Sequence, residues 1–368
     1  MLLTILFYIF LFAVTIQLCF YILIFRKFLV AKPSPTNLVN PPISILIAAK
    51  NEAENLKKNL PTILTQCYPN FEVVIINDAS TDNTLEVIKN LQQDHQHLKL
   101  VSIAKTDVYN GNKKNALSKG IEAARHEHLL FTDADCKPKS EQWVVEMTGH
   151  FSQTSNIVLG YGAHEKIDNS FLNKLIRYET LLTAIQYFSY AKIGIPYMGV
   201  GRNLAYKKEM FKQNNGFESH EHIKSGDDDL FVSEIATAKN VDICFNKKGH
   251  TISESKKSYK DWFLQKRRHI STATSYKRIH QLLLGLFFSS QFLFWTVAII
   301  LLILSFNWPI VTILVLIRLI AQYHTILYSA KKLEEEDIVL FVPLLDILLV
   351  FSQFGLFLTN LFSKPKHW

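Results

Sequence analysis

The chain has 368 residues, of which 48% are hydrophobic and 20% are charged, with a net charge of +8. This mixture is typical of a soluble unit joined to membrane segments, and it argues against one uniform globular protein. The positive charge fits contact with an anionic cytoplasmic leaflet. Because the sequence has no nucleic-acid-binding motif, nucleic acid is the weaker hypothesis for a partner, and we expect none. The scattered cysteines exclude a disulfide framework and a zinc site: Cys19, Cys67, Cys136 and Cys244.

The N-terminal segment is one apolar run without a charge, over residues 1–25, which is long enough to span a membrane. A cleaved signal peptide would carry its positive charges before the apolar run. Here Arg26, Lys27 and Lys32 follow it. We therefore predict a retained transmembrane helix over residues 1–27, with its C-terminal end in the cytoplasm.

Short apolar runs alternate with helix-forming segments through the next hundred residues. Such alternation implies a parallel sheet with right-handed crossovers, so we predict an α/β fold. The predicted strands are residues 43–49, 71–76, 98–103 and 129–132. The predicted helices are residues 54–64, 80–91 and 115–124.

Acidic residues follow three of these strands: Glu52, Asp78, Asp133 and Asp135. The carboxyl ends of parallel strands lie at one edge of a sheet, where α/β proteins bind ligands. Alternate residues of an extended chain point the same way, so Asp133 and Asp135 can share one target. The Asp-x-Asp tripeptide alone fits a solvated turn equally well. The four acidic residues at these strand ends together favour a nucleotide site with Mg²⁺ or Mn²⁺, which bind few carboxylates plus phosphates.

Several motifs in this order resemble the family 2 glycosyltransferases, which have the GT-A nucleotide-sugar fold. The resemblance covers roughly residues 42–270, and each motif alone is weak. The matching segments are residues 44–52, 76–84, 111–120, 131–135, 199–206 and 225–230, and the Gln-x-x-Arg of residues 265–268. The family's tryptophan after that arginine is replaced by His269, which leaves the acceptor and processivity open.

The resemblance implies a mostly parallel, Rossmann-like GT-A domain at residues 37–280 and a role for each matching residue. It places the donor nucleotide sugar against Ala48, Asn51, Glu52, Asp78, Lys113, Asp133, Gln265 and Arg268. Asp135, with Asp133, would hold a divalent cation, Mn²⁺ or Mg²⁺. Asp227 or Asp228 would be the catalytic base, and we favour Asp228. The acceptor side would be Gly201, Arg202, Asn203 and His269.

Two further segments allow alternatives. The amphipathic stretch of residues 171–185 fits either a helix in the membrane interface or a helix packed on the sheet domain. His220 and His222 have the spacing of metal ligands, but we interpret them as part of a solvated loop.

The C-terminal region, residues 281–363, carries three apolar runs at residues 282–305, 308–330 and 338–362. Four spans would place residues 37–280 in the cytoplasm and the basic tail at 364–368 outside, against the positive-inside trend, so the last run is alternatively re-entrant. Charges within spans are costly. We therefore expect Arg318 and Asp346 either to pair or to line a path for the acceptor.

These features predict a multi-pass protein of a bacterial inner membrane with a cytoplasmic catalytic domain. Its expected activity is inverting, metal-dependent transfer from a nucleotide-diphosphate sugar, UDP-linked, to a lipid-linked or membrane-proximal glycan. The rival readings are a processive polysaccharide synthase and a catalytically silent scaffold that binds nucleotide sugar. A transporter is disfavoured because the polar domain is large and the spans show no internal repeat.

Overall fold

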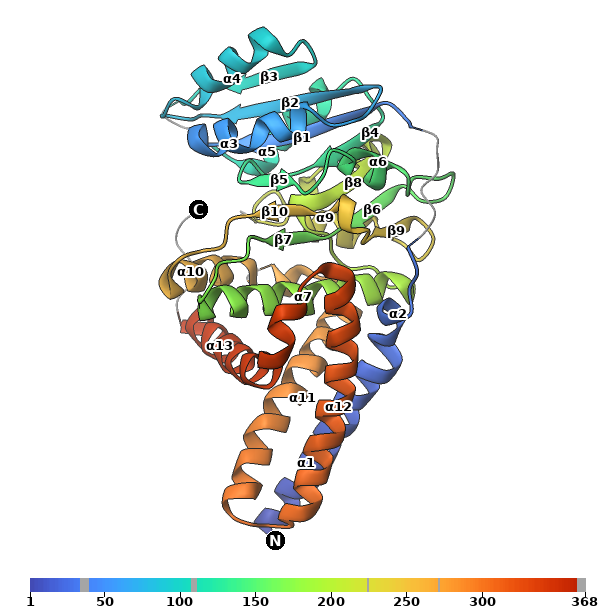
Figure 1. Cartoon of the computed structure of the whole chain (residues 1–368), viewed down its shortest axis with the longest axis vertical. Coiled ribbons are helices and arrows are strands. Elements are labelled where there is room, and N and C mark those ends of the chain that lie inside the picture. The colour runs from blue at the N-terminus through green and yellow to red at the C-terminus, as the bar shows by residue number, and fades with distance from the viewer. Residues whose placement is uncertain (34–39, 107–110, 224, 271, 363–368) are drawn as a thin grey trace. The chain divides into compact units, whose positions relative to one another are not determined.

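The structure, a computed structural model, describes residues 1–33, 40–106, 111–223, 225–270 and 272–362 (Figure 1). The chain forms two compact units. The α/β unit comprises Lys32–Glu165 and Gly194–Ser255, and the helical unit comprises Met1–Ala31, Lys166–Ile193 and Lys256–Trp368. The basic tail at 364–368 and the predicted domain start at residue 37 lie outside the described residues.

The α/β unit is built on a seven-stranded sheet in the order β3-β2-β1-β4-β8-β6-β9. Its strands are β1 (Ile43–Ala49), β2 (Phe71–Asp78), β3 (Leu98–Ile103), β4 (His128–Phe131), β6 (Ile157–Gly160), β8 (Leu204–Lys207) and β9 (Val241–Cys244). Strand β8 runs antiparallel to both of its neighbours, and the other described pairs are parallel. The predicted α/β fold with a mostly parallel sheet is confirmed.

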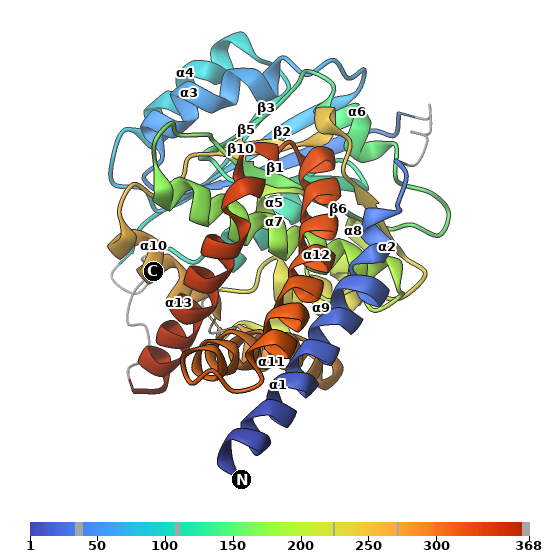
Figure 2. The same ribbon diagram turned by 60° about the horizontal axis from the view of Figure 1, so that its bottom comes forward.

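Helices α3 (Ala53–Leu64) and α4 (Thr84–Asp94) lie next to each other on one face of this sheet (Figures 1 and 2). Leu56, Leu60 and Ile63 recur at helical spacing on α3 and are buried in the same core as the strand residues Ile45 and Ile75. Burying each of these side chains contributes roughly 1.5–3 kcal/mol. The apolar period of the sequence therefore fixes both the helix and its buried face.

Helix α5 (Lys113–Ala123) packs very closely on β1 and β2. A Cβ atom at Gly120 would lie 2.6 Å from Cδ1 of Ile76, so only glycine allows this approach. The first turn of α5 is capped by Asn112, whose side chain accepts hydrogen bonds from the backbone N–H groups of Lys114 and Asn115. Close packing and the cap together fix where Lys113 and Lys114 stand.

A smaller sheet of three strands completes the α/β unit, in the order β5-β10-β7. Its strands are β5 (Cys136–Pro138), β7 (Gly162–His164) and β10 (Thr251–Ser253). The register sets Ser253 beside Cys136 on one neighbouring strand and beside His164 on the other. Three residues far apart in the sequence thus meet directly after the Asp-x-Asp segment.

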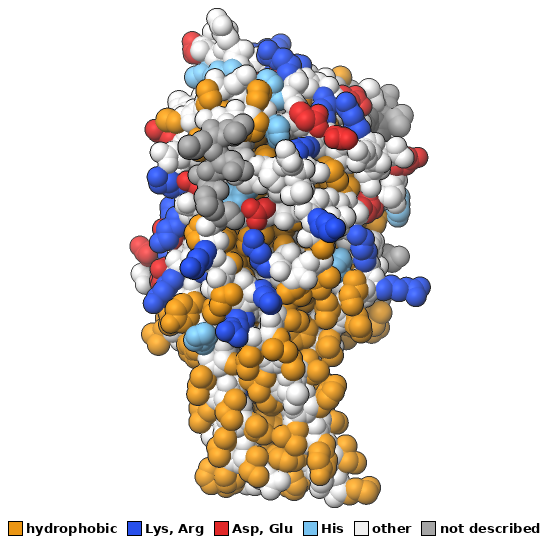
Figure 3. Space-filling view, turned by 90° about the vertical axis from the view of Figure 1, so that its right-hand side faces the viewer, with side chains coloured by type: hydrophobic (Ala, Val, Ile, Leu, Met, Phe, Trp, Pro, Cys, Tyr) orange, Lys and Arg blue, Asp and Glu red, His pale blue; other side chains and the backbone are white. Residues whose placement is uncertain are grey.

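The helical unit contains four helices that are long and apolar enough to cross a membrane: Leu2–Leu29, Arg278–Ile303, Trp308–Leu333 and Glu336–Phe362. In Figure 1, α1 (Leu2–Cys19), α11 (Arg278–Ile303) and α12 (Trp308–Leu333) run side by side, whereas α13 (Val342–Phe362) is inclined to them. Hydrophobic side chains cover the outside of this bundle, as expected for a surface in contact with lipid (Figure 3).

Helix α7 (Phe171–Lys192) belongs to the helical unit and packs on α2 (Arg26–Leu29), α12 and α13. The guanidinium of Arg177, on α7, is buried and forms ion pairs with Glu335 and Asp337. Glu335 precedes the short helix η6 (Glu336–Phe341), and Asp337 lies within it. Glu179 pairs with Lys266 at 2.9 Å and accepts a hydrogen bond from Trp262, both on α10 (Tyr259–Ile270). The amphipathic stretch thus packs on the candidate membrane helices, and its ion pair between Arg177 and Glu335 is buried.

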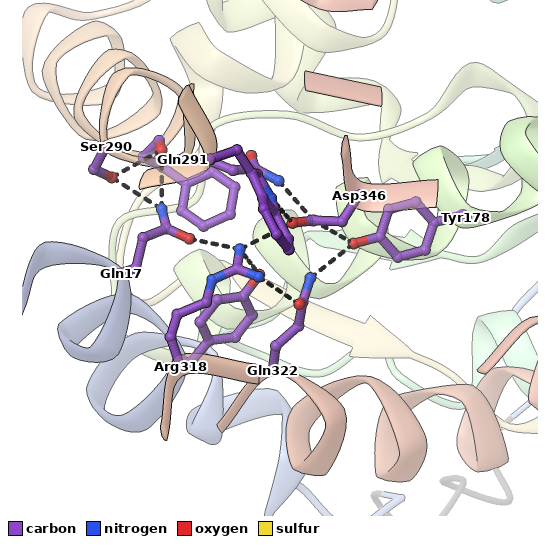
Figure 4. A network of polar contacts seen from close by, with 10 residues as sticks. Gln17, Tyr178, Ser290, Gln291, Arg318, Gln322 and Asp346 are labelled. Carbon is purple, nitrogen blue, oxygen red and sulfur yellow. Dashed lines mark hydrogen bonds and ion pairs between the residues drawn. The ribbon is translucent and has the colours of Figure 1, made fainter. Parts of the chain in front are cut away.

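A buried polar network joins the helices of this unit (Figure 4). Nη2 of Arg318 lies 3.0 Å from a carboxylate oxygen of Asp346, and both side chains are 0% exposed. Arg318 also donates to Gln17 on α1 and to Gln322 on α12. The predicted pairing of Arg318 with Asp346 is confirmed. Because neither side chain reaches the surface, they do not line an open path.

The carboxylate of Asp346 accepts three more hydrogen bonds in this network. The donors are the Tyr178 hydroxyl at 2.6 Å, the Gln291 amide at 2.6 Å and the Trp295 indole at 2.7 Å. Arg318 in turn lies over the rings of Phe294 and Trp295. One ion pair therefore connects α1, α7, α11, α12 and α13.

Candidate active site

A pocket opens at the carboxyl ends of β1 and β4, where the strand order reverses, as ligand sites of open α/β sheets do. Its lining comes from both strands, from α5, from the loop before β8 and from the segment before α9 (Asp229–Ile235). The lining residues are Ala48, Lys113, Leu117, Phe131, Thr132, Asp133, Gly201, Leu204, Tyr206, Asp227 and Asp228. Six of the predicted site residues therefore share one pocket.

Asn51 links the turns that follow β1 and β2. It adopts a left-handed backbone conformation, with φ of 58°, which asparagine tolerates better than most residues. Its side-chain oxygen accepts a hydrogen bond from the N–H of Thr81 at 2.8 Å, and its own N–H donates to Ser80 at 3.0 Å. Asn51, which we predict to contact the donor nucleotide sugar, thus holds together the turns that follow β1 and β2.

Glu52 and Asp78 stand at the same sheet edge. Burial raises the pKa of Glu52, and the carboxylates of Asp135 and Asp133 raise it further, although a hydrogen bond from Asn55 lowers it. Asp78 is the last residue of β2 and is 4% exposed. The predicted cluster of acidic strand ends therefore concentrates negative charge near the Asp-x-Asp segment.

Asp133, Asp135 and Cys136 form a group whose ligand atoms lie within 4.8 Å of one another. Burial and then the neighbouring Asp133 raise the pKa of Asp135, so the two carboxylates repel each other. A divalent cation relieves this repulsion, and Mg²⁺ and Mn²⁺ prefer carboxylate oxygens. The two aspartates therefore fit the predicted ion.

Cys136 is a poor ligand for such an ion. Mg²⁺ and Mn²⁺ prefer oxygen to sulfur ligands. Burial, and then the carboxylates of Asp135 and Asp133, raise the pKa of the thiol well above the usual value. The thiol donates to a carboxylate oxygen of Asp135 at 3.2 Å. We interpret Cys136 as a residue that orients Asp135.

Lys113 connects the predicted metal residues to the predicted base. Its ammonium lies 2.9 Å from Asp133 and 2.9 Å from Asp227. Burial lowers the pKa of Lys113, but Asp133, Asp227 and Asp228 outweigh burial and raise it well above the usual value. The lysine therefore stays protonated and neutralises part of the charge between the two acidic groups.

Asp228 occupies the N-cap of α9, where its side chain accepts a hydrogen bond from the N–H of Asp229 at 2.8 Å. Its other oxygen accepts one from the N–H of Gly201 at 2.6 Å. Burial, and then the carboxylates of Asp227 and Asp229, raise the pKa of Asp228 to about 7, although Lys113 and the Gly201 N–H lower it. A carboxylate with such a pKa is suited to accept a proton near neutral pH.

The loop before β8 is fixed at several points. The carbonyl of Arg202 accepts hydrogen bonds from the hydroxyls of Thr132 and Thr251. The guanidinium of Arg202 donates to Ser253 at 2.6 Å and lies 3.1 Å from a ring nitrogen of His164. This loop therefore holds the Gly201 N–H in place beside Asp228.

Asn203, which the resemblance places on the acceptor side, is fully buried in the structure. The side chain is 0% exposed, and its amide donates to the carbonyls of Tyr161 and Gly249 and accepts from the indole of Trp143. Its polar atoms are all used within the α/β unit. Asn203 thus supports the loop and offers no surface to an acceptor.

Gln265 and Arg268 lie on α10, which belongs to the helical unit. The side chain of His269 is outside the described part of the structure. The roles of these three residues stay predictions.

Sequence reasoning missed three kinds of residue around the pocket. Cys136, His164 and Ser253 lie on the small sheet, whose short strands carry no periodic signal. His220 was assigned to a solvated loop, which is wrong, because it is 3% exposed. Lys114 is 2% exposed beside the predicted donor residue Lys113. The two consecutive lysines at the start of a capped helix were the signal from which Lys114 could have been found.

Comparisons with known proteins agree with this geometry. The family model of Glycosyl transferase family 2 matches residues 44–214. A poly-beta-1,6-N-acetyl-D-glucosamine synthase of Staphylococcus epidermidis is 40% identical over 93 residues, which are 25% of this chain and 21% of that protein. An uncharacterized glycosyltransferase of Escherichia coli, YibD, is 31% identical over 93 residues, 25% of this chain and 26% of that protein. The matches thus span only about a fifth to a quarter of these relatives.

Among solved structures, the mannosyltransferase PcManGT from Pyrobaculum calidifontis, in complex with GDP-Man and Mn²⁺, has a TM-score of 0.61 at 18% identity. The alignment covers 94% of this chain and 99% of that one, and it supports the same fold. Residues 44–214 are therefore similar to the Glycosyl transferase family 2 model, and the chain shares the fold of this mannosyltransferase.

Proposed function

We propose that this protein is a membrane-bound, inverting, metal-dependent glycosyltransferase. It moves a sugar from a nucleotide-diphosphate donor, UDP-linked, to a lipid-linked or membrane-proximal glycan on the cytoplasmic face of a bacterial membrane. The observation that carries this proposal is the arrangement of one pocket, in which Lys113 separates the Asp133 carboxylate from Asp227 and Asp228. Four candidate membrane spans support the membrane location.

In this reaction Asp228 accepts the proton of the acceptor hydroxyl. The acceptor oxygen then forms a bond to the anomeric carbon, and the bond from that carbon to the diphosphate oxygen breaks, with its electron pair leaving on the nucleoside diphosphate. Attack opposite the leaving group inverts the anomeric configuration. Asp135 and Asp133 would hold Mn²⁺ or Mg²⁺, and the bound ion would supply positive charge against the charge that develops on the diphosphate. Lys113 stays protonated and adds positive charge to the same pocket.

The donor sugar that we propose to test first is N-acetylglucosamine. The support is the 40% identical segment of a poly-beta-1,6-N-acetyl-D-glucosamine synthase. The same relative keeps the processive polysaccharide synthase as a second candidate. A silent nucleotide-sugar scaffold is less favoured, because the metal residues, the lysine and the proposed base are all present in one pocket.

Removal of the metal is expected to abolish turnover. The full chain, purified in detergent, would be supplied with lipid extract from bacterial membranes and with UDP-N-acetylglucosamine, UDP-glucose or GDP-mannose, and nucleotide release would be measured. We expect release from one donor, its loss in EDTA, and its recovery with Mn²⁺ or Mg²⁺ in the wild type but not in Asp135→Ala. Release that is unaffected by EDTA would contradict the metal assignment, and polymeric product would favour the synthase.

The turnover of the proposed donor should depend on pH through Asp228. The raised pKa of Asp228, about 7, means that the carboxyl is protonated and inactive below this pH, and ionised and active above it. We expect kcat/KM to rise about tenfold per pH unit on the acid side and to level off above about 7. The groups facing Asp228 that set this limb are Asp227, Asp229 and Lys113. A kcat/KM that does not change between about pH 5 and 8 would contradict the assignment of Asp228 as the base.

A further inference from the structure

Lys114 is a buried ammonium group that the proposed chemistry does not use. It is 2% exposed, and burial lowers its pKa to about 8, although Asp227, Asp229 and Glu234 act in the opposite direction. Its ammonium donates hydrogen bonds to the carbonyl of His220 at 2.6 Å and to that of Ile223 at 2.9 Å. A buried lysine is costly unless its contacts compensate, so its place on α5 calls for a reason.

The contacts of Lys114 continue to the segment that carries the proposed base. One ring nitrogen of His220 lies 3.0 Å from the carbonyl of Gly226, and the other lies 3.0 Å from the carboxylate of Glu234 on α9. Gly226 has a φ of +98°, and a Cβ atom there would lie 2.5 Å from Leu230. Asp227 and Asp228 follow directly. The direction in which the chain enters α9 is therefore set by a glycine with positive φ, whose carbonyl oxygen is held by His220.

We propose that Lys114 and His220 form a clamp that positions Asp228 for proton transfer. The two lysines at the start of α5 contact different parts of the α/β unit. Lys113 binds the carboxylates of Asp133 and Asp227 directly, whereas Lys114 anchors the loop to the same rigid helix turn. Because α5 is fixed on the sheet through Gly120, the clamp ties the base to the sheet edge that holds Asp133 and Asp135. Lys114 is thus a positioning residue, and this inference rests on the proposed function.

The test compares Lys114→Met with Lys208→Met in the full chain, using UDP-N-acetylglucosamine or whichever donor of the panel is turned over. Lys208 is a matched control, since its ammonium also donates to two backbone carbonyls, those of Glu122 and Ala124 at the other end of α5, away from the acidic cluster. The readouts are kcat, KM for the donor, the acid limb of the pH profile, and hydrogen exchange of residues 216–223 and 225–229.

In Lys114→Met we expect kcat to fall about 10²-fold, because a displacement of about 1 Å at a reacting group has an effect of this size, while KM changes little. The acid limb should move to higher pH, since a positive charge near Asp227 and Asp229 is lost. Exchange of the two loop segments should rise. Lys208→Met should leave all four readouts as in the wild type. His220→Ala, which keeps the Lys114 charge, should lower kcat without moving the limb, and it serves if Lys114→Met does not fold.

An unchanged kcat in both clamp variants, a rise in KM alone, or an equal loss in Lys208→Met would overturn the clamp. Failure of the proposed function looks different, since Asp228→Asn would then retain wild-type turnover, or no donor would be turned over. In that case hydrogen exchange of residues 216–223 and 225–229 tests the clamp without turnover. Protection that is unaltered in Lys114→Met would show that Lys114 does not anchor this loop.

Discussion

Asp228→Asn is expected to lower kcat by about 10²–10⁴-fold, which is the usual contribution of a general base. Asparagine keeps the shape of the side chain, although its single oxygen can replace only one of the two carboxylate oxygens that accept the N–H groups of Gly201 and Asp229. It cannot take up a proton from the acceptor hydroxyl. The measurement is donor turnover in detergent at a pH well above 7, with KM for the donor expected to change little, because Asp228 is not a proposed donor ligand.

Asp94→Asn is the matched control for this variant. Asp94 is an exposed residue at the end of α4 in the same unit, and its substitution should leave turnover unchanged. Asp227→Asn should also impair turnover, since it removes the carboxylate that pairs with Lys113. If Asp228→Asn stays active while Asp227→Asn is silent, the base is Asp227.

Arg318→Ala is expected to destabilise the helical unit by about 3–5 kcal/mol, because it leaves one partner of a buried ion pair without the other. The carboxylate of Asp346 would keep its bonds from Tyr178, Gln291 and Trp295 but lose its counter-charge. The measurement is the thermal unfolding midpoint and the folded yield of the full chain in detergent. Arg26→Ala, at an exposed position outside this network, is the control.

The double variant Arg318→Ala with Asp346→Ala tests whether the two side chains act together. Since each single variant leaves an uncompensated charge and the double variant leaves none, the losses should not add. The double variant should be no less stable than Arg318→Ala alone. Strictly additive losses would show that the pair contributes no coupling and that each residue acts only through its other neighbours.

Much of the fold was predictable because the spacing of apolar residues along the chain indicates which side chains are buried. The runs at 43–49, 71–76, 98–103 and 129–132 are strands within a residue or two, since buried parallel strands are continuously apolar. The long apolar runs correspond to four candidate membrane helices among the described residues for the same reason. Strands β6, β8 and β9 were not predicted, since strands of only 4 residues leave little pattern.

The amino-acid sequence by itself determined the residue types that could perform the chemistry and their order along the chain. Asp133, Asp135 and the three aspartates from Asp227 were recognisable because several motifs occur together in one order, although each motif alone also fits a turn or a helix start. The sequence also indicated that Arg318 and Asp346 needed partners, since charges within apolar helices are costly.

Only the tertiary structure decided which of these residues meet. Lys113 reaches both Asp133 and Asp227 because α5 packs closely on the sheet at Gly120. Asn203 and His220, which look like surface residues in the sequence, are buried because their polar atoms bond to distant backbone and side-chain groups. Local pattern reports the burial of apolar side chains, whereas the burial of a polar side chain depends on partners that long-range packing supplies.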